Sequence, residues 1–150
     1  MYEDAAMDQS ERLTFNERNI EEFRATGGKM PSSFGDAPVL LLHTTGVKSG
    51  EQRIAPMMYL ADADDPDRVY VFASNGGRDT HPAWYGNIVA APHGLTVEIG
   101  AERVAAEAEV LEEPRRSEVY ATQAELYDAF AGYAEGTDRV IPVVALQLSR

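Results

Sequence analysis

The sequence contains no cysteine, and it has only 3 histidines. The absence of cysteine excludes disulfides, thiolate metal sites and cysteine nucleophiles. The histidines, which are His43, His81 and His93, show no ligand spacing with one another or with nearby carboxylates. Zinc and iron sites in proteins need such clusters of ligands. We therefore expect no bound metal.

Basic residues are also scarce. The chain has 13 lysines and arginines against 25 aspartates and glutamates, so its formal net charge at pH 7 is -12. The average field of such a chain repels phosphate, which argues against nucleic acid and anionic membranes as partners. An anionic ligand would have to be held by a local cluster of cations.

Long apolar runs are missing as well. No run approaches the roughly 18 apolar residues that suggest a membrane-spanning helix, and Met1-Tyr2-Glu3-Asp4 has no basic or apolar signal region. Glu17, Glu21 and Glu22 make the first predicted helix acidic, so membrane contact is expected to be peripheral at most. We expect a cytoplasmic protein with a flexible segment at 1–13 and a single domain at 14–150.

The apolar pattern predicts three helices and about six strands. Thr14 and Glu17 form a capping box for the first helix, and Pro82 suits the first turn of the second, with Thr80 or His81 as its cap. The helices are expected near 15–26, 82–91 and 114–132, and the strands at 39–44, 53–60, 69–73, 95–99, 103–111 and 140–148. Short links favour antiparallel pairing. The order predicts an α+β protein whose sheet curls into a barrel, with Pro56 at an edge or a bulge.

The first candidate site is the glycine-rich segment 44–56, between two apolar runs that we expect to be buried strands. Lys48 offers a compact ammonium and Arg53 a planar fork of donors, and together they suit a phosphate or a carboxylate. This segment is therefore predicted to be an anion-binding loop. The alternative is a surface turn with two solvated charges.

Two further segments carry candidate residues. The glycines of 74–77 allow close backbone approach, and the start of the helix at 82–84 offers free amides beside Trp84 to a planar ring with carbonyls on its rim. The alternative is that Trp84 anchors the core and the glycines form a simple turn. Tyr133, near a helix end, either donates to a bound substrate or is an ordinary packing residue.

Taken together, these segments resemble the deazaflavin (coenzyme F420)-dependent nitroreductase and quinone reductase family. The resemblance runs in order from about residue 16 to 148 and is carried by 40–56, by Ala73-Ser74-Asn75-Gly76-Gly77, by Pro82-Ala83-Trp84-Tyr85-Gly86-Asn87 and by Thr137-Asp138-Arg139-Val140-Ile141-Pro142-Val143. It implies a split β-barrel related to flavin-binding barrels. It also implies coenzyme F420 as the cofactor and a quinone-like acceptor as the substrate.

The resemblance also implies roles for individual residues. Lys48 and Arg53 would hold the cofactor phosphate and its acidic tail, and Tyr133 would face the substrate. Tyr133 and Ser74 are the candidate catalytic residues. The other residues expected to bind the cofactor are Ser49, Gly50, Ile54, Ala55, Pro56, Ala73, Asn75, Gly76, Gly77, Pro82, Ala83, Trp84 and Asn87.

The sequence departs from the family pattern at three positions. Asn75 stands where many members have a lysine, which removes a cation near the ring. Phe130 and Met58 stand where some members have tyrosines. The substrate pocket is therefore expected to be less polar than in relatives that reduce nitro compounds.

The expected reaction is transfer of a hydride from reduced F420 to a quinone-like, nitro or enone acceptor. The cofactor supplies the difficult chemistry, and protein groups hold the ring and exclude water. An unperturbed tyrosine has a pKa of about 10, so Tyr133, Ser74 or solvent is a suitable proton source. The alternatives are a binding or sequestering module without turnover, and a barrel that takes FMN or haem. A second copy of the chain, in a homodimer, is a further expected partner.

Overall fold

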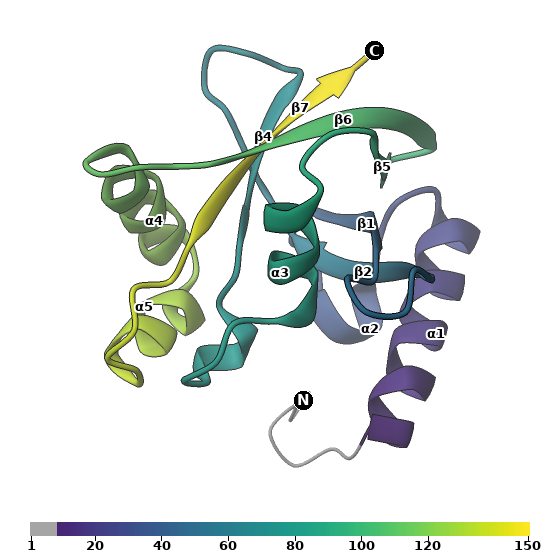
Figure 1. Ribbon diagram of the computed structural model, residues 1–150, viewed down its shortest axis with the longest axis horizontal. Coiled ribbons are helices and arrows are strands. Elements are labelled where there is room, and N and C mark those ends of the chain that lie inside the picture. Colours follow the sequence, from purple (N-terminus) through teal and green to yellow (C-terminus); the bar gives the residue numbers. More distant parts are fainter. Residues whose placement is uncertain (1–8) are drawn as a thin grey trace.

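The computed structural model describes the backbone of residues 9–150 and the side chains from residue 14 onward. Figure 1 shows its helices around the outside of a curled sheet. The elements are α1 (Gln9–Thr26), α2 (Pro31–Phe34), β1 (Val39–Thr45), β2 (Gln52–Met58), β3 (Leu60–Ala61), β4 (Arg68–Phe72), the 3₁₀ turn η2 (Asn75–Gly77), α3 (Ala83–Ala90), β5 (Leu95–Ile99), β6 (Glu102–Val110), α4 (Arg115–Leu126), α5 (Asp128–Glu135) and β7 (Val143–Ser149).

The strands form one antiparallel sheet in the order β2-β1-β5-β6-β7-β4-β3. β2 and β3 stand at opposite ends of this order, yet Tyr59 alone separates them in the chain. Because consecutive Cα atoms lie only about 3.8 Å apart, the sheet must curl until its two ends meet. The predicted α+β split barrel is confirmed. The described part has seven strands rather than six because the predicted strand 53–60 divides at Tyr59.

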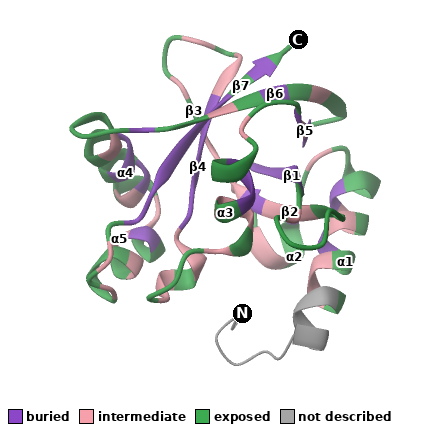
Figure 2. Ribbon diagram, viewed as in Figure 1, coloured by how far each residue is buried: buried purple, intermediate pink, exposed green. Residues whose placement is uncertain are grey.

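Alternation along the strands separates the inside of the curl from its outside. Leu40 and Leu42 of β1 join a cluster with residues from β2, β4, β5, β6 and β7, which fills the inside. Val39 and Leu41 point the other way and pack with Phe23 of α1. Both faces of β1 are therefore buried, as Figure 2 shows in purple.

The α4–α5 pair covers the outer face of β4 and β7. Phe72 of β4 meets Tyr120 of α4 and Phe130 of α5 edge-on, with ring centroids 5.9 and 5.5 Å apart. Such pairs contribute about 0.5–1.5 kcal/mol each beyond the area that they bury. The predicted single helix 114–132 is wrong, because Tyr127 is extended (φ -137°, ψ 109°) and separates two helices. This break is what turns Phe130 onto Phe72.

Several predicted boundaries are also wrong. α1 begins at Gln9, so Thr14 lies inside the helix and does not cap it. Pro82 is the residue before α3, and no side chain caps that helix, which contradicts the predicted cap at Thr80 or His81. β7 begins at Val143, three residues later than predicted. Of the expected flexible segment 1–13, residues 1–8 lie outside the described part and the rest belong to α1.

β2 is an edge strand, as Pro56 predicted. It pairs with β1 on one side, and no described strand hydrogen-bonds to its other side. For this reason the residues of β2 are mostly half-buried. We expected both strands that flank the 44–56 loop to be buried. That prediction is correct for β1 but wrong for β2. Proline is tolerated there because the edge needs no N–H donor.

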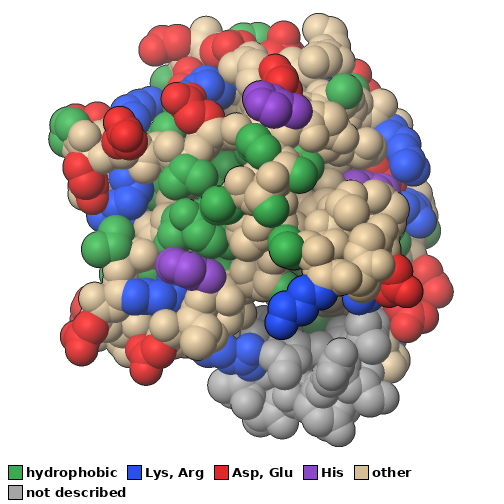
Figure 3. All heavy atoms as spheres, viewed as in Figure 1, with side chains coloured by type: hydrophobic (Ala, Val, Ile, Leu, Met, Phe, Trp, Pro, Cys, Tyr) green, Lys and Arg blue, Asp and Glu red, His purple; other side chains and the backbone are tan. Residues whose placement is uncertain are grey.

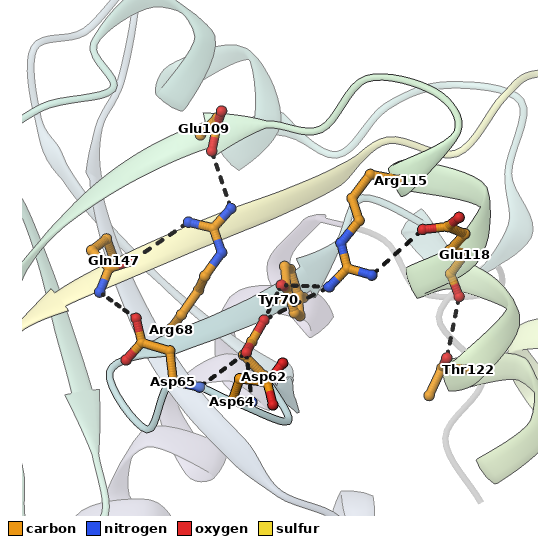
Figure 4. A network of polar contacts seen from close by, with 10 residues as sticks. All are labelled: Asp62, Asp64, Asp65, Arg68, Tyr70, Glu109, Arg115, Glu118, Thr122 and Gln147. Atoms are coloured by element: carbon orange, nitrogen blue, oxygen red, sulfur yellow. Dashed lines mark hydrogen bonds and ion pairs between the residues drawn. The ribbon is translucent and has the colours of Figure 1, made fainter.

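A polar network fastens α4 and the β3–β4 turn to the sheet (Figure 4). Tyr70, which is buried, donates its hydroxyl hydrogen to Asp62 and accepts a hydrogen bond of 3.1 Å from Arg115. The guanidinium groups of Arg115 and Arg68 lie 5.6 and 5.7 Å from the centre of the Tyr70 ring. Arg68 also pairs with Glu109 of β6 at 3.1 Å. The network thus joins β4, β6 and α4 on the outside of the curl.

Acidic side chains are spread widely over the surface (Figure 3). On the same face, hydrophobic side chains gather between α3 and the α4–α5 pair. Within residues 9–150, no helix combines the length and apolar character needed to cross a bilayer. Among the side chains of residues 14–150, no three or more histidines, aspartates or glutamates gather into a group that could hold a metal ion.

A buried carboxylate anchors α1 to the sheet. Glu98 of β5 accepts hydrogen bonds of 3.1 and 2.8 Å from Arg24 of α1, and it lies 2.6 Å from Nε2 of His43. Glu98 and His43 are 8% and 7% exposed, so solvent screens their contact weakly, whereas Arg24 is half exposed and its contact is screened more. The hydrogen bond from Arg24, with a further contribution from His43, lowers the pKa of Glu98 to about 2.

We predict that Glu98 stabilises the protein in a pH-dependent way. Its pKa falls from 4.5 to about 2 on folding, so its contribution is complete above pH 4.5 and is lost as the pH falls toward 2. In urea titrations, E98Q should be less stable than wild type at pH 6, and that difference should shrink by roughly 1–3 kcal/mol at pH 3. E125Q, on an exposed face of α4, is the matched control. An equal deficit of E98Q at both pH values would contradict this.

Candidate functional site

A cavity of about 1610 Å³ opens beside the free edge of β2. Its wall comes from β2, the β1–β2 loop, the segment after β4, the start of α3, α5 with Tyr127 before it, and one side of α1 and α2. The structure thus brings together residues that are far apart in the sequence. The predicted site residues in this wall are Lys48, Ser49, Arg53, Ile54, Ala55, Pro56, Ser74, Asn75, Gly76, Pro82, Ala83, Trp84, Asn87 and Tyr133.

Three predicted residues do not line the cavity. Ala73 is fully buried at the end of β4. Gly50 closes the β1–β2 turn with φ of 72°, which favours glycine. Gly77 lies behind Tyr133, because a Cβ atom on Gly77 would stand 3.2 Å from the Cα of Tyr133. Gly77 therefore allows the close approach of α5, and with it Tyr133, to this wall.

The β1–β2 loop and the start of β2 carry the two predicted cations. Gly46 and Glu51 are joined by a backbone hydrogen bond of 2.8 Å at the base of the loop, with Lys48 beyond it and Arg53 just after it on β2. The guanidinium group of Arg53 is half exposed and lies 3.2 Å from the carboxylate of Glu51. An incoming anion would compete with Glu51 for Arg53.

The open edge of β2 adds backbone groups to the wall. Hydrogen bonds join Tyr59 to Pro38 and Gly46 to Glu51, and paired positions alternate between them in an antiparallel ladder. This alternation directs the backbone groups of Ile54 and the carbonyl of Pro56 away from β1. Both residues line the cavity, so the wall offers hydrogen-bonding groups that β1 does not use.

Arg139 organises the segment after β4, a role that the sequence did not reveal. Its guanidinium group donates to the carbonyl oxygens of Ala73, Ser74 and Arg78 at 3.1, 2.8 and 2.8 Å. It also lies 3.0 Å from Nδ1 of His81. Because the guanidinium is a rigid fork of five donors, these bonds fix the shape of the segment. The sequence signal for Arg139 was its place in the last motif of the family resemblance.

Two further cavity residues, Arg78 and His81, were also missed as site residues. Arg78 adds a third cation to the wall. Burial and the charge of Arg139 lower the pKa of His81, which favours a neutral ring near pH 7. The adjacent segments 74–77 and 82–84 were predicted to belong to the site. A single histidine or arginine in a loop, by itself, does not indicate a functional role.

The tyrosines near the cavity differ in what they can do. Tyr120 donates to the backbone oxygen of Phe130 at 2.6 Å, and burial raises its pKa to about 12, so it is a poor proton donor. Tyr133 lines the cavity and packs on Phe130 with ring centroids 5.2 Å apart. Its assignment as a catalytic residue, with Ser74, stays a prediction.

Asn87 holds the β1–β2 loop against α3. Its side-chain oxygen accepts from the backbone N–H of Val47 at 3.2 Å, and its nitrogen donates to the hydroxyl of Thr44 at 3.0 Å. The residue is buried. Both ends of the amide are thus engaged within the protein, and this contact positions the loop that carries Lys48.

We predict that N87L loosens this loop. Removing both hydrogen bonds should lower the free energy of unfolding by roughly 1–3 kcal/mol. In hydrogen–deuterium exchange followed by mass spectrometry, the peptide spanning residues 44–51 should exchange faster. N87D, which keeps an acceptor for the N–H of Val47, is the control and should change exchange less. Wild-type exchange of that peptide in N87L would show that Asn87 does not hold the loop.

Comparisons with known proteins point to one family. A family model described as F420H(2)-dependent quinone reductase matches residues 16–147. An F420H(2)-dependent quinone reductase of Mycobacterium tuberculosis is 32% identical over 128 residues, which cover 83% of each chain.

Two solved structures are also similar to this chain. The F420-H2 dependent reductase FDR-A is 34% identical, with 73% of this chain and 94% of that chain covered and a TM-score of 0.64. A second structure, a domain-swapped dimer, is 31% identical, with 90% and 99% covered and a TM-score of 0.65. The resemblance drawn from the sequence motifs is confirmed. The chain therefore belongs to the F420H(2)-dependent quinone reductase family.

Proposed function

We propose that this F420-dependent reductase passes a hydride to a quinone-like acceptor inside the cavity beside β2. When bound, reduced F420 supplies the hydride, which carries two electrons and one proton. One cavity wall contains both the cations at the β1–β2 loop and the start of β2 and the apolar groups around Trp84. This observation carries the proposal. The roles of individual residues below are part of the proposal.

The cation set fits an anionic cofactor. Lys48, Arg53 and Arg78 line the same cavity in a chain of net charge -12. Charge-assisted hydrogen bonds to phosphate or carboxylate are roughly twice as strong as neutral ones. We assign the phosphate and the acidic tail of F420 to Lys48 and Arg53, with Ser49 beside them.

The rest of the wall fits a planar ring. Pro56 and Trp84 offer apolar surface, and the turn at 74–76 brings the backbone close to the cavity. Asn75, which by the sequence resemblance stands where many members have a lysine, donates to the backbone oxygen of Thr80 at 3.0 Å and so closes this turn. It therefore shapes the site without adding charge.

The size of the cavity favours two ligands at once. Pockets for one small molecule usually hold about 300–1,000 Å³, and this cavity holds about 1610 Å³. A donor and an acceptor bound together can reach the contact that hydride transfer needs. Tyr133, Phe130 and Met58 would then face the acceptor, and Tyr133, Ser74 or solvent would supply the proton.

Assembly and location belong to the proposal as well. One matched structure is a domain-swapped dimer, which supports a homodimer for this chain. A cytoplasmic location with at most peripheral membrane contact agrees with the acidic first helix. The alternatives of a sequestering module and of an FMN or haem barrel are not favoured by the family match.

Turnover tests the reductase function directly. Under single-turnover conditions, the protein should oxidise reduced F420 in the presence of menadione, as followed by absorbance of the deazaflavin. A sequestering module would bind F420 with no oxidation of it, and an FMN or haem barrel would show spectral changes with those cofactors instead. If the protein did not speed the oxidation of reduced F420, the proposal would be contradicted.

Three variants test the anion site with effects of opposite sign. K48A and R53A should each weaken F420 binding by more than about tenfold, because each removes a charge-assisted contact. E51Q should tighten binding by about two- to fivefold, since Glu51 competes for Arg53 through an exposed ion pair. Affinity is measured by fluorescence titration, with E125Q as the control for net charge. If F420 affinity were unchanged in K48A and R53A, the assignment of the phosphate and the acidic tail to Lys48 and Arg53 would be contradicted.

A further inference from the structure

We propose that His81, held in a single tautomer by Arg139, is the hydrogen-bond donor that meets negative charge on the acceptor oxygen. The inference rests on the proposed reductase function and adds a residue to it. His81 lines the cavity next to Pro82, Ala83 and Trp84.

The tautomer follows from the contact with Arg139. Nη1 of Arg139 lies 3.0 Å from Nδ1 of His81. A guanidinium group has donors and no acceptor, so Nδ1 must accept this hydrogen bond. A neutral imidazole whose Nδ1 accepts carries its proton on Nε2. His81 is therefore a fixed N–H donor at Nε2.

Neighbouring contacts hold both residues in place. Arg139 is locked by its bonds to the carbonyl oxygens of Ala73, Ser74 and Arg78, so it cannot turn away from the imidazole without breaking them. On its own side, the His81 ring packs on Tyr85 with ring centroids 4.8 Å apart. Arg139 thus acts as a positioning residue, through His81.

The charges around His81 favour the neutral ring. Arg139 is in direct contact, and Arg78 and Asp79 precede His81 in the same segment. The carboxylate of Asp79 accepts from the hydroxyl of Thr137 at 2.8 Å. His81 is exposed overall, but partial burial of its ring and the charge of Arg139 both lower its pKa, which favours the neutral ring near pH 7.

A neutral donor suits the proposed reaction. Transfer of a hydride would break a C–H bond of reduced F420, leaving that cofactor oxidised, and would form one new bond to hydrogen on the quinone, with the electron pair placed on an oxygen as negative charge. An N–H aimed at that oxygen stabilises the charge as it grows. His81 keeps its proton throughout, and a proton from Tyr133, Ser74 or solvent completes the hydroquinone. Two electrons and two protons are then accounted for.

The tautomer is tested first on the protein without cofactor. In nitrogen NMR of ¹⁵N-histidine-labelled protein, Nδ1 of His81 should have the shift of an unprotonated ring nitrogen, and Nε2 that of a protonated one. The titration midpoint should lie below the value of about 6.5 for free histidine. H81Q supplies the assignment by loss of its signals. A protonated Nδ1 at pH 7 would overturn the proposal.

Single-turnover oxidation of reduced F420 by menadione tests the donor role. H81F should slow the hydride step by about tenfold to a hundredfold, which is less than the hundredfold to thousandfold cost of losing a fully enclosed oxyanion donor because the His81 side chain is exposed. H81Q, whose amide N–H can replace Nε2–H, should recover most of the rate, and F420 affinity should change less than twofold in both. H93F, at the exposed His93, is the control and should match wild type.

The outcomes separate the two proposals. An active wild type with an equally active H81F would overturn the donor role and leave the reductase function standing. A wild type that does not oxidise reduced F420 would overturn the reductase function and the donor role together. An active wild type with a slow H81F and a rescued H81Q would support both.

Discussion

Binding of an anionic cofactor by a chain of net charge -12 depends on where its few cations lie. At the open edge of β2, Lys48 of the β1–β2 loop and Arg53 of β2 line one large cavity, where we propose that the cofactor binds. Asn87 ties that loop to α3, and Arg139 fixes the opposite segment through three carbonyl oxygens. The fold thus brings three of the chain's few cations, Lys48, Arg53 and Arg78, into the wall of one cavity.

Much of the scaffold could be predicted because its signals are local. The alternation at 95–99 and 103–111, with glycine at the turn, predicted the β5–β6 hairpin, and the apolar run at 39–42 predicted the buried strand β1. Pro56 predicted an edge, because a missing N–H is tolerated only where no strand pairs. The cations of the loop could be identified since they stand out in an acidic sequence.

The features that could not be predicted depend on contacts between distant segments. Helical spacing continues through Tyr127, where the chain is extended, and nothing in the local sequence indicates that Phe130 packs on Phe72. Arg139 and His81 are 58 residues apart in the chain, and nothing in either local sequence indicates that one fixes the tautomer of the other. The sheet closes at Tyr59 because β3 pairs with β4, and this pairing could not be predicted from the local sequence either.

The central claim is that local cations hold the acidic part of the cofactor. It is tested most directly by comparing, in calorimetric titrations at low and high salt, F420 with its deazaflavin chromophore lacking the phosphate and the acidic tail. Our account predicts much tighter binding of intact F420 at low salt, with an advantage that shrinks as salt is added. Equal, salt-independent affinities of the two ligands would contradict it.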